Sequence, residues 1–275
     1  MGIVNVTPDS FYDGGRYEAL DAARERVARL LAEGADILDI GGESSKPGAP
    51  RVSSEQQIAR ISGALDAALA QGALVSVDTA SPAVASFALG RGAHAINDVT
   101  CLGDAELASV VARHEAFLIV SHARAHQSEM RDFSEWPDSD YSDVAAEVRR
   151  ELASARERAV ERGVRRDRVW FDPGLGFSKN ARQSIELLSR VAELSSDGTP
   201  VVVGAGRKSF IKSLDGSAPA DRLGGTIAAS VWASRHGAHF VRVHDVAAVR
   251  QALLVEEALV GAALARSGSA GASPP

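Results

Sequence analysis

The chain has 275 residues, 45% of them apolar, and its 30 basic and 36 acidic residues give a formal net charge of −6. A chain of this length buries roughly 75% of its unfolded surface when it folds, so one large core is possible. The acidic balance and the lack of a long basic run argue against binding to a nucleic-acid backbone or an anionic membrane. An anionic ligand would therefore be bound by a few local cations.

Cysteine and histidine content bears on metal and redox chemistry. Cys101 is the only cysteine, which excludes an intrachain disulfide and a cysteine-based metal site, and the seven histidines show no metal-ligand spacing such as H-E-x-x-H. No apolar stretch reaches the ~18 residues of a membrane span, and no signal-peptide pattern precedes the first apolar run. We therefore predict a soluble cytoplasmic protein that binds neither membranes nor nucleic acids.

Short apolar runs rich in β-branched residues recur along the chain and are typical of buried strands. Segments with helical apolar spacing separate them; in residues 17–34, for example, Ala23, Val27 and Leu30 share one face. Strands that alternate with helices predict right-handed βαβ units and a parallel sheet. The eight strand-like runs cover residues 2–6, 35–40, 73–78, 93–98, 116–122, 168–174, 200–205 and 239–244.

Eight such units in a chain of this length predict a single-domain α/β fold, the (β/α)8 TIM barrel, which typically has ~250 residues. A doubly wound open sheet is the alternative, but its nucleotide-binding motifs G-x-G-x-x-G and G-x-x-x-x-G-K-[ST] are absent. We place the barrel at residues 1–266 and predict a disordered tail at residues 267–275, which read SGSAGASPP.

Polar or charged residues lie at or just beyond the C-terminal end of every predicted strand. Active sites of (β/α)8 barrels form at this end, so these residues are the candidate site. Taken singly, Asp78 and Asp98 can be ordinary caps, and Asp172 can belong to a turn. Together the residues favour a ligand site. In chain order they are Asn5, Glu43, Asp78, Asn97, Asp98, His122, Asp172, Lys208, Arg242 and His244.

The mixture of side chains indicates the kind of ligand. Asp and Asn at several strand ends suit the edge of a flat heterocycle, because a buried carboxylate accepts paired N–H bonds strongly. Lys208, Arg242 and His244 follow the last two strands, where barrels often hold a phosphate. The sequence therefore predicts a ligand with a polar ring and an anionic tail.

Longer motifs surround these strand ends and together cover nearly the whole chain. They read MGIVNVTPDSFYDGG, GADILDIGGESSKPGA, VSVDT, GAHAIND, DPGLGFSKN, VVVGAGRKSFI, DRLGGTIAA and FVRVHDV. In this combination and order the chain resembles the dihydropteroate synthase family, whose members join a pterin to p-aminobenzoate in folate biosynthesis.

The resemblance assigns most strand-end residues to one of two parts of a substrate, 6-hydroxymethyl-7,8-dihydropterin pyrophosphate. The residues implied at the pterin ring are Asp78, Asn97, Asp172 and Lys208. Those implied at the pyrophosphate are Asn5, Arg242 and His244, with Asn5 also a ligand of the implied cofactor, Mg²⁺. All of these except Asn97 are implied to be catalytic.

The reaction implied by the resemblance is an alkyl transfer. Pyrophosphate leaves the pterin methylene in an SN1-like step, and the arylamine attacks the cationic pterin that remains. Cations and Mg²⁺ stabilise a departing pyrophosphate, while buried carboxylates such as Asp78 and Asp172 tolerate a positive ring. No covalent enzyme nucleophile is needed.

Two loops, residues 5–15 and 41–50, are similar to the family's two mobile lids, which cover the pterin and form the p-aminobenzoate pocket. Their glycines allow large dihedral changes, although ordinary flexible loops are the alternative. The substrate contacts that the resemblance implies here and on later strands are Phe11, Ser45, Lys46, Pro47, Phe177, Gly204 and Gly206.

The chain departs from the family pattern mainly on the acceptor side. Ser45-Lys46 replaces the usual Thr-Arg, and Gly206 replaces a serine near the aminobenzoate carboxylate. In addition, Ser121-His122-Ala123 replaces Met-His-Met, and Met1 is already in the first predicted strand, which a short segment usually precedes in the family. We hypothesise that the pterin donor is retained, whereas the acceptor amine or its sulfonamide analogues are handled differently; neutral drift is the alternative.

Two other functions stay open at this point. A non-catalytic pterin-binding paralogue would bind the pterin without turnover. A barrel like the methyltetrahydrofolate:corrinoid methyltransferases would share the ring-edge residues, but it has little use for a pyrophosphate clamp.

Regions outside the strand ends bear on partners. The resemblance implies a homodimer, which would bury the apolar helical stretches 223–236 and 246–265. The long loop at residues 124–143 is either functional or an interface, with packing over the barrel rim as the alternative.

Overall fold

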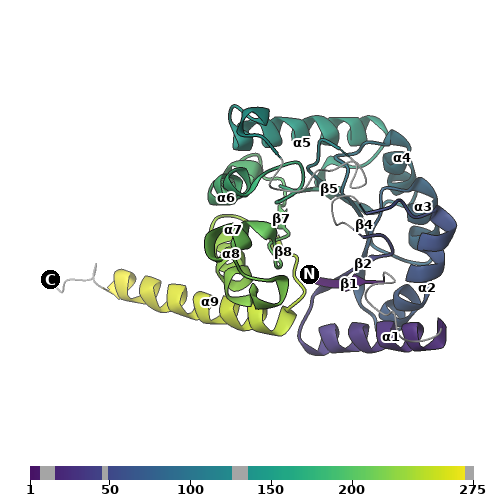
Figure 1. Ribbon diagram of the computed structural model, residues 1–275, viewed down its shortest axis with the longest axis horizontal. Helices are drawn as coiled ribbons and strands as arrows, with labels where there is room; N and C mark the ends of the chain where they lie inside the picture. The colour runs from purple at the N-terminus through teal and green to yellow at the C-terminus, as the bar shows by residue number, and fades with distance from the viewer. Residues whose placement is uncertain (7–15, 45–48, 126–135, 270–275) are drawn as a thin grey trace.

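The computed structural model describes residues 1–6, 16–44, 49–125 and 136–269. Within this part, eight parallel strands form a ring that the helices surround (Figure 1). The strands are β1 (Gly2–Asn5), β2 (Ile37–Gly41), β3 (Leu74–Asp78), β4 (Ala95–Asp98), β5 (Phe117–Ser121), β6 (Val169–Asp172), β7 (Val202–Val203) and β8 (Phe240–Val241).

The helices begin at side chains that cap their first turns. Ser53, Ser81 and Asp143 each accept a hydrogen bond from the backbone N–H three residues further on. The α-helices are α1 (Arg16–Ala32), α2 (Ser54–Ala70), α3 (Pro82–Gly90), α4 (Ala105–Arg113), α5 (Val144–Glu161), α6 (Ala181–Ser189), α7 (Ser209–Asp215), α8 (Leu223–Arg235) and α9 (Val246–Ser269).

Backbone hydrogen bonds close the ring of strands. Strands β1 to β6 form one parallel sheet in sequence order, and β7 pairs with β8. Isolated parallel bridges join the two parts, from Phe171 to Val201 and from Gly2 to Val243. At the second junction Ile3 N donates to Val243 O at 3.0 Å. The predicted (β/α)8 barrel is therefore confirmed.

The inside of the barrel is apolar at the N-terminal end of the strands. Here a cluster that we call the apolar plug fills the barrel, and two of its rings, Trp170 and Phe240, stack with centroids 4.8 Å apart. The plug fills the barrel at the N-terminal ends of the strands, so a ligand would enter from their C-terminal ends. Its members are Met1, Ile37, Ile119, Trp170, Val202 and Phe240.

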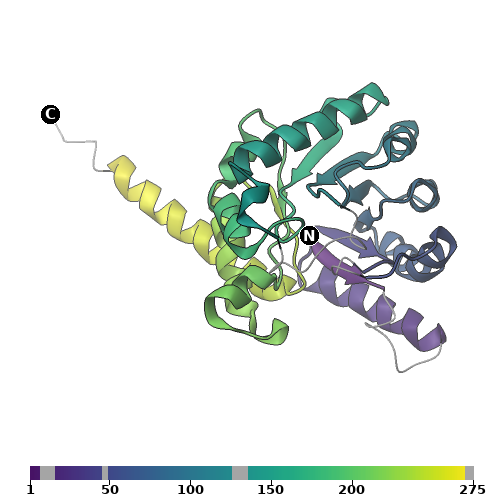
Figure 2. The same cartoon turned by 45° about the horizontal axis from the view of Figure 1, so that its top comes forward.

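The C-terminal region differs from the sequence prediction. Helix α9 continues through Ser269, three residues into the segment predicted to be a disordered tail, and residues 270–275 lie outside the described part. The helix runs well beyond the barrel wall, past α8 (Figures 1 and 2). Within the described residues, no helix has the length and apolar character needed to cross a membrane.

Candidate active site

The inward face of several strands changes from apolar to polar along its length. Side chains alternate between the two faces of a strand, so a residue two positions beyond the plug also points into the barrel. Asp39 lies two positions after Ile37 of the plug. In the same way, Asp172 follows Trp170 and Arg242 follows Phe240. The register pairs Asp78 with Asn97 on the adjacent strands β3 and β4. A polar layer therefore lies directly above the apolar plug.

Arg242 lies between two carboxylates in this layer. Its Nε is 2.5 Å from Asp39 Oδ2, and its Nη2 is 2.8 Å from Asp78 Oδ2. Asp39 Oδ2 also accepts a hydrogen bond of 3.1 Å from Asn97 Nδ2. Asp39 is completely buried, and the other members are nearly so. Strands β2, β3, β4 and the segment after β8 thus meet through one charged cluster.

Three oxygen atoms in the polar layer lack a partner. Asp39 Oδ1, Ser76 Oγ and Asn97 Oδ1 are buried and make no hydrogen bond with any described residue. A buried polar atom without a partner is costly, so these positions favour a ligand or water that donates hydrogen bonds. Because the Asn97 amide nitrogen is used by Asp39, its oxygen is left as an acceptor.

A second group of polar side chains lies across the barrel on β6 and α7. Asp172 Oδ1 accepts a hydrogen bond of 2.7 Å from Gly174 N. Its other oxygen lies 3.6 Å from the position that a Cβ on Gly204 would occupy, so the missing side chain leaves space beside it. Lys208, the residue before α7, places its Nζ 4.3 Å from the centre of the Phe177 ring. A cation and a carboxylate therefore face the same space.

Burial shifts the pKa values of several of these groups toward neutral pH. It raises the pKa of Asp78 to about 7, against the opposing effect of Arg242, and it also raises the pKa of Asp172. Burial lowers the pKa of Lys208 to about 8. Both protonation states of Asp78 and of Lys208 are therefore accessible near pH 7, which is typical of groups that exchange hydrogen bonds with a ligand.

The rim between β1 and β8 forms the other end of the site. Asn5 ends β1 with its side chain exposed, and it lines a cavity of about 510 Å³ together with His244 and Arg26. Burial lowers the pKa of His244 to about 4, so its ring is neutral at pH 7. Arg26, on α1, donates to the backbone oxygens of both Ile3 (3.3 Å) and His244 (2.8 Å). This guanidinium ties the two strands together behind the cavity.

The structure brings most of the predicted site residues together at the barrel mouth. Four other predicted contacts, Phe11, Ser45, Lys46 and Pro47, lie outside the described residues, as do most residues of the two predicted lids. The residues found around the polar layer and its rim are Asn5, Asp78, Asn97, Asp172, Phe177, Gly204, Gly206, Lys208, Arg242 and His244.

Three of the other strand-end residues have structural partners instead. Asp98 accepts hydrogen bonds from Thr100 Oγ1 at 2.6 Å and Leu102 N at 2.5 Å, so it caps a turn. Glu43 accepts from Val52 N at 2.9 Å. His122 is completely buried and faces α5 and the loop after β6.

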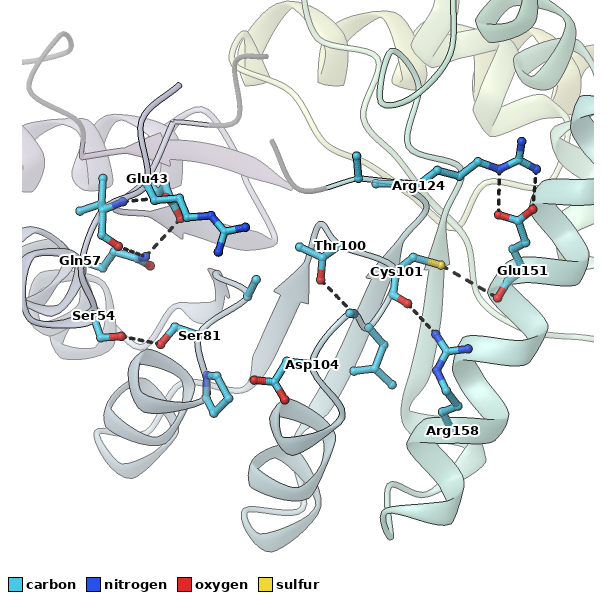
Figure 3. A pocket seen from close by; sticks show the side chains of 18 of the residues that line it. Glu43, Ser54, Gln57, Ser81, Thr100, Cys101, Asp104, Arg124, Glu151 and Arg158 are labelled. Atoms are coloured by element: carbon cyan, nitrogen blue, oxygen red, sulfur yellow. Dashed lines mark hydrogen bonds and ion pairs between the residues drawn. The ribbon is translucent and has the colours of Figure 1, made fainter. Parts of the chain in front are cut away.

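A second cavity, of about 930 Å³, lies beside the barrel mouth above the loops that follow β2 to β5 (Figure 3). Its charged side chains are largely paired. Arg124 contacts Glu151, and Arg158 donates to the backbone oxygen of Cys101 at 2.8 Å. This cavity holds acidic and basic groups together, so its charge does not select one kind of ion.

Sequence reasoning missed Asp39 and Arg26. Asp39 lies in the middle of the run ADILDI, away from the strand end, and was therefore passed over. A charged residue between Leu38 and Ile40 is nevertheless a signal, because such a strand is buried on both faces and a buried carboxylate needs a partner. Arg26 carries no comparable signal, since arginine is common on the exposed face of a helix.

The fold and the site define a class of protein: a (β/α)8 barrel with buried carboxylates, an amide and cations gathered at the C-terminal ends of its strands. A family model described as "Pterin binding enzyme" matches residues 1–244. The Escherichia coli K12 dihydropteroate synthase is 36% identical over 95% of this chain and 92% of its own length. The chain belongs to the dihydropteroate synthase family of pterin binding enzymes.

Two further comparisons agree with this assignment. A solved structure of Xanthomonas albilineans dihydropteroate synthase with 4-aminobenzoic acid has a TM-score of 0.86 and 39% identity, covering 94% of this chain and 92% of that one. A probable bifunctional folylpolyglutamate synthase/dihydropteroate synthase of Haloferax volcanii is 41% identical over 90% of this chain. This chain spans only 29% of that longer protein.

We expect Asp39→Ala to destabilise the barrel by about 2–4 kcal/mol, because breaking a buried ion pair leaves part of a charge uncompensated. Asp36→Ala, three residues earlier at an exposed position, is the matched control and should change the free energy of unfolding by less than about 0.5 kcal/mol. Urea unfolding at pH 7.5 measures both. Equal effects of the two substitutions would show that the Asp39 cluster adds no stability.

Proposed function

We propose that the protein catalyses the dihydropteroate synthase reaction, in which 6-hydroxymethyl-7,8-dihydropterin pyrophosphate and p-aminobenzoate give 7,8-dihydropteroate and pyrophosphate. The observation that carries the proposal is the pair of partnerless acceptors, Asp39 Oδ1 and Asn97 Oδ1, in the polar layer of the barrel. A 2-aminopyrimidinone ring presents N–H donors along one edge, and these can supply the missing hydrogen bonds. The Lys208 ammonium then suits the acceptor atoms on the other side of the ring.

The carboxylates in the site also suit the charge that develops in the reaction. When the bond between the pterin methylene and its oxygen breaks, the electron pair leaves with pyrophosphate and the pterin becomes cationic. Asp78 and Asp172 lie in the layer that would surround this ring, so their charge stabilises it. The amine nitrogen of p-aminobenzoate then bonds to the methylene carbon and loses one proton.

The β1–β8 rim supports binding of the leaving group. The neutral His244 can donate one hydrogen bond and Asn5 adds an exposed amide, while Arg242, two residues before His244 and paired with Asp39 and Asp78, carries a permanent charge. A methyltetrahydrofolate:corrinoid methyltransferase would not need a cationic group at this place. The rim therefore favours the synthase over that alternative.

We include Mg²⁺ in this proposal. Within the described residues, no cluster of three or more His, Cys, Asp or Glu side chains could hold a metal ion. Mg²⁺ commonly keeps several waters and uses one or two protein oxygens together with substrate phosphates, so the exposed Asn5 amide oxygen fits such an ion. When bound, Mg²⁺ would neutralise charge on the departing pyrophosphate.

A turnover assay with Mg²⁺ and both substrates tests the reaction, with pyrophosphate and dihydropteroate followed separately. We expect equal amounts of both products, and we expect Asn5→Ala to raise the Mg²⁺ concentration needed for half-maximal rate several-fold. Pyrophosphate without dihydropteroate would indicate another acceptor. Pterin binding without either product would identify a non-catalytic paralogue and contradict the proposal.

We also propose that Gly206 changes how the acceptor and its sulfonamide analogues are bound. A Cβ at this position would meet Val243 Cα at 3.5 Å and the His244 ring at 3.6 Å, which are ordinary contact distances. A serine would therefore fit without displacing its neighbours. The glycine leaves out a hydroxyl group that could donate to the carboxylate of p-aminobenzoate.

Gly206→Ser is expected to raise kcat/KM for p-aminobenzoate about tenfold, since a hydrogen bond to a charged group contributes about 1.5–3 kcal/mol. Gly224→Ser on α8, where a Cβ meets nothing within 4 Å, is the matched control and should leave kcat/KM unchanged. A wild-type KM in the ordinary micromolar range that Gly206→Ser does not alter would contradict this proposal.

We propose, finally, a cytoplasmic homodimer built on α8 and α9. Four large apolar side chains of α9 are exposed, and so is Trp232 on α8. Such a surface is typical of a face that packs against another chain. The α9 residues concerned are Leu254, Val255, Leu259 and Leu264.

Sedimentation velocity at micromolar concentration should give a mass close to twice the 28.8 kDa of one chain. Leu259→Glu should shift the protein to monomer by placing a charge in the interface. Leu74→Glu provides the control, because Leu74 is also half-exposed but begins β3, which pairs with β2 and β4 and does not belong to α8 or α9. A monomeric wild-type protein would rule out this dimer.

A further inference from the structure

Lys179 is a buried cation that the proposed reaction does not use. It follows the loop after β6 and precedes Asn180, the N-cap of α6. Its side chain is completely buried, which is rare for lysine unless the charge is paired. The nearest explanation, a lysine that merely fills space, does not account for its hydrogen bonds.

The ammonium group of Lys179 has a complete set of acceptors. Its Nζ lies 2.9 Å from His122 Nδ1, 2.9 Å from Phe177 O and 3.1 Å from Gly174 O. An ammonium has three N–H donors, so these three acceptors use all of them; His122 O is a fourth, more distant acceptor at 3.5 Å. The arrangement requires that His122 Nδ1 carries no proton.

The state of His122 then follows from its other ring nitrogen. His122 Nε2 carries the proton and donates to Glu151 Oε2 at 2.8 Å. Burial lowers the pKa of His122 to about 4, and the hydrogen bond from His122 helps to lower the pKa of Glu151 to about 2. Glu151 also contacts Arg124 at 2.5 Å (Figure 3). A chain of hydrogen bonds thus runs from Arg124, through Glu151 and His122, to Lys179.

The loop that Lys179 holds carries two parts of the active site. The bonds to Gly174 O and Phe177 O fix the backbone on both sides of its turn. Gly174 N in turn donates to Asp172 Oδ1, and the Phe177 ring faces Lys208. Gly174 has φ +64, and a Cβ there would lie 2.0 Å from His122 O, so the loop and His122 are in close contact.

We propose that Lys179 is a positioning residue for the transfer reaction: with His122 and Glu151, its ammonium holds the β6–α6 loop so that Asp172 and Phe177 are aligned on the pterin. This inference rests on the proposed function. A neutral amine has only two N–H donors and a lone pair, so on deprotonation one of the three acceptors loses its bond and the loop shifts. Activity therefore falls as Lys179 loses its proton.

The pH range of this effect follows from the groups around Lys179. Burial lowers its pKa to about 7, while Asp172, Cys101 and Glu151 act to raise it and Arg124 acts to lower it. The unfolded chain keeps the ordinary value near 10.5, so above pH 7 the unfolded state binds more protons. The Lys179 contribution to the free energy of unfolding consequently rises with pH. Deprotonation of Lys179 therefore does not by itself destabilise the fold.

Two matched variants on α5 test the network. Glu151→Gln removes the charge but keeps an acceptor for His122, whereas Glu147→Gln removes an equivalent charge that pairs with Arg124 and does not touch His122. Neither residue belongs to the catalytic or binding groups. The measurements are the pH profile of kcat/KM, the affinity for 6-hydroxymethyl-7,8-dihydropterin, and the ¹⁵N shifts of His122.

As pH rises, kcat/KM should fall first with the deprotonation of Lys179. The midpoint of this first fall should lie about half a pH unit or more lower in Glu151→Gln and should be unchanged in Glu147→Gln. The later inflection from Lys208 should not move, because its pKa is set by burial and then by Asp172, Arg242 and Asp78, and neither α5 residue is among these groups. Identical pH profiles for the two variants would overturn the proposal. A His122 that titrates near pH 6.5, or that carries its proton on Nδ1, would overturn it as well.

Lys179→Met supplies a direct test, with Leu65→Ala in α2 as a control for loss of buried packing. Lys179→Met should lower kcat at least tenfold at a temperature where both variants are folded, whereas Leu65→Ala should lower Tm but leave kcat within about twofold. A folded Lys179→Met variant with normal kcat would contradict the proposal. If Lys179→Met does not fold, the comparison of Glu151→Gln with Glu147→Gln tests the proposal. A wild-type protein without turnover would refute the proposed function instead, and the His122 shifts and pterin affinity would still report on the network.

Discussion

The double ion pair of Arg242 with Asp39 and Asp78 is the interaction on which the barrel mouth depends. A guanidinium cannot be buried without a counter-charge, and here two carboxylates from early strands contact it where the last strand returns to them. Because the carboxylates lie on β2 and β3, this requirement links the two ends of the sequence. It also orients the Asn97 amide, whose nitrogen is taken by Asp39 and whose oxygen is left for a ligand.

A second buried cation, Lys179, lies on the other side of the barrel, and it is neutralised in a different way. Its partners are backbone oxygens and a neutral imidazole, and the Glu151 carboxylate lies one hydrogen bond further away. Arg242 therefore links strands, whereas Lys179 shapes a loop. The proposed pterin site would lie between these two cations, with a hydrogen-bonded buried cluster on each side.

The distribution of the departures from the family pattern agrees with this division. Asp78, Asn97 and Asp172, which we propose to face the ring, are held by hydrogen bonds or ion pairs of buried groups. Gly206, by contrast, lies beside His244 at the rim, where a Cβ meets only ordinary contacts. Substitution there changes a ligand contact without disturbing a buried charge, so the acceptor side can vary while the donor side stays constant.

The sequence by itself determined the (β/α)8 fold, because alternating strand-like and helical runs allow few other arrangements. It also located most of the site, since polar side chains at the ends of parallel strands must meet at one edge of the barrel. Only the tertiary structure separated Asp98, which caps a turn, from Asp78, which faces Arg242, although both end a strand with the same residue type. It alone revealed Asp39 and Lys179, because the partners of a buried charge come from distant parts of the chain: Arg242 lies 203 residues from Asp39, and His122 lies 57 residues from Lys179.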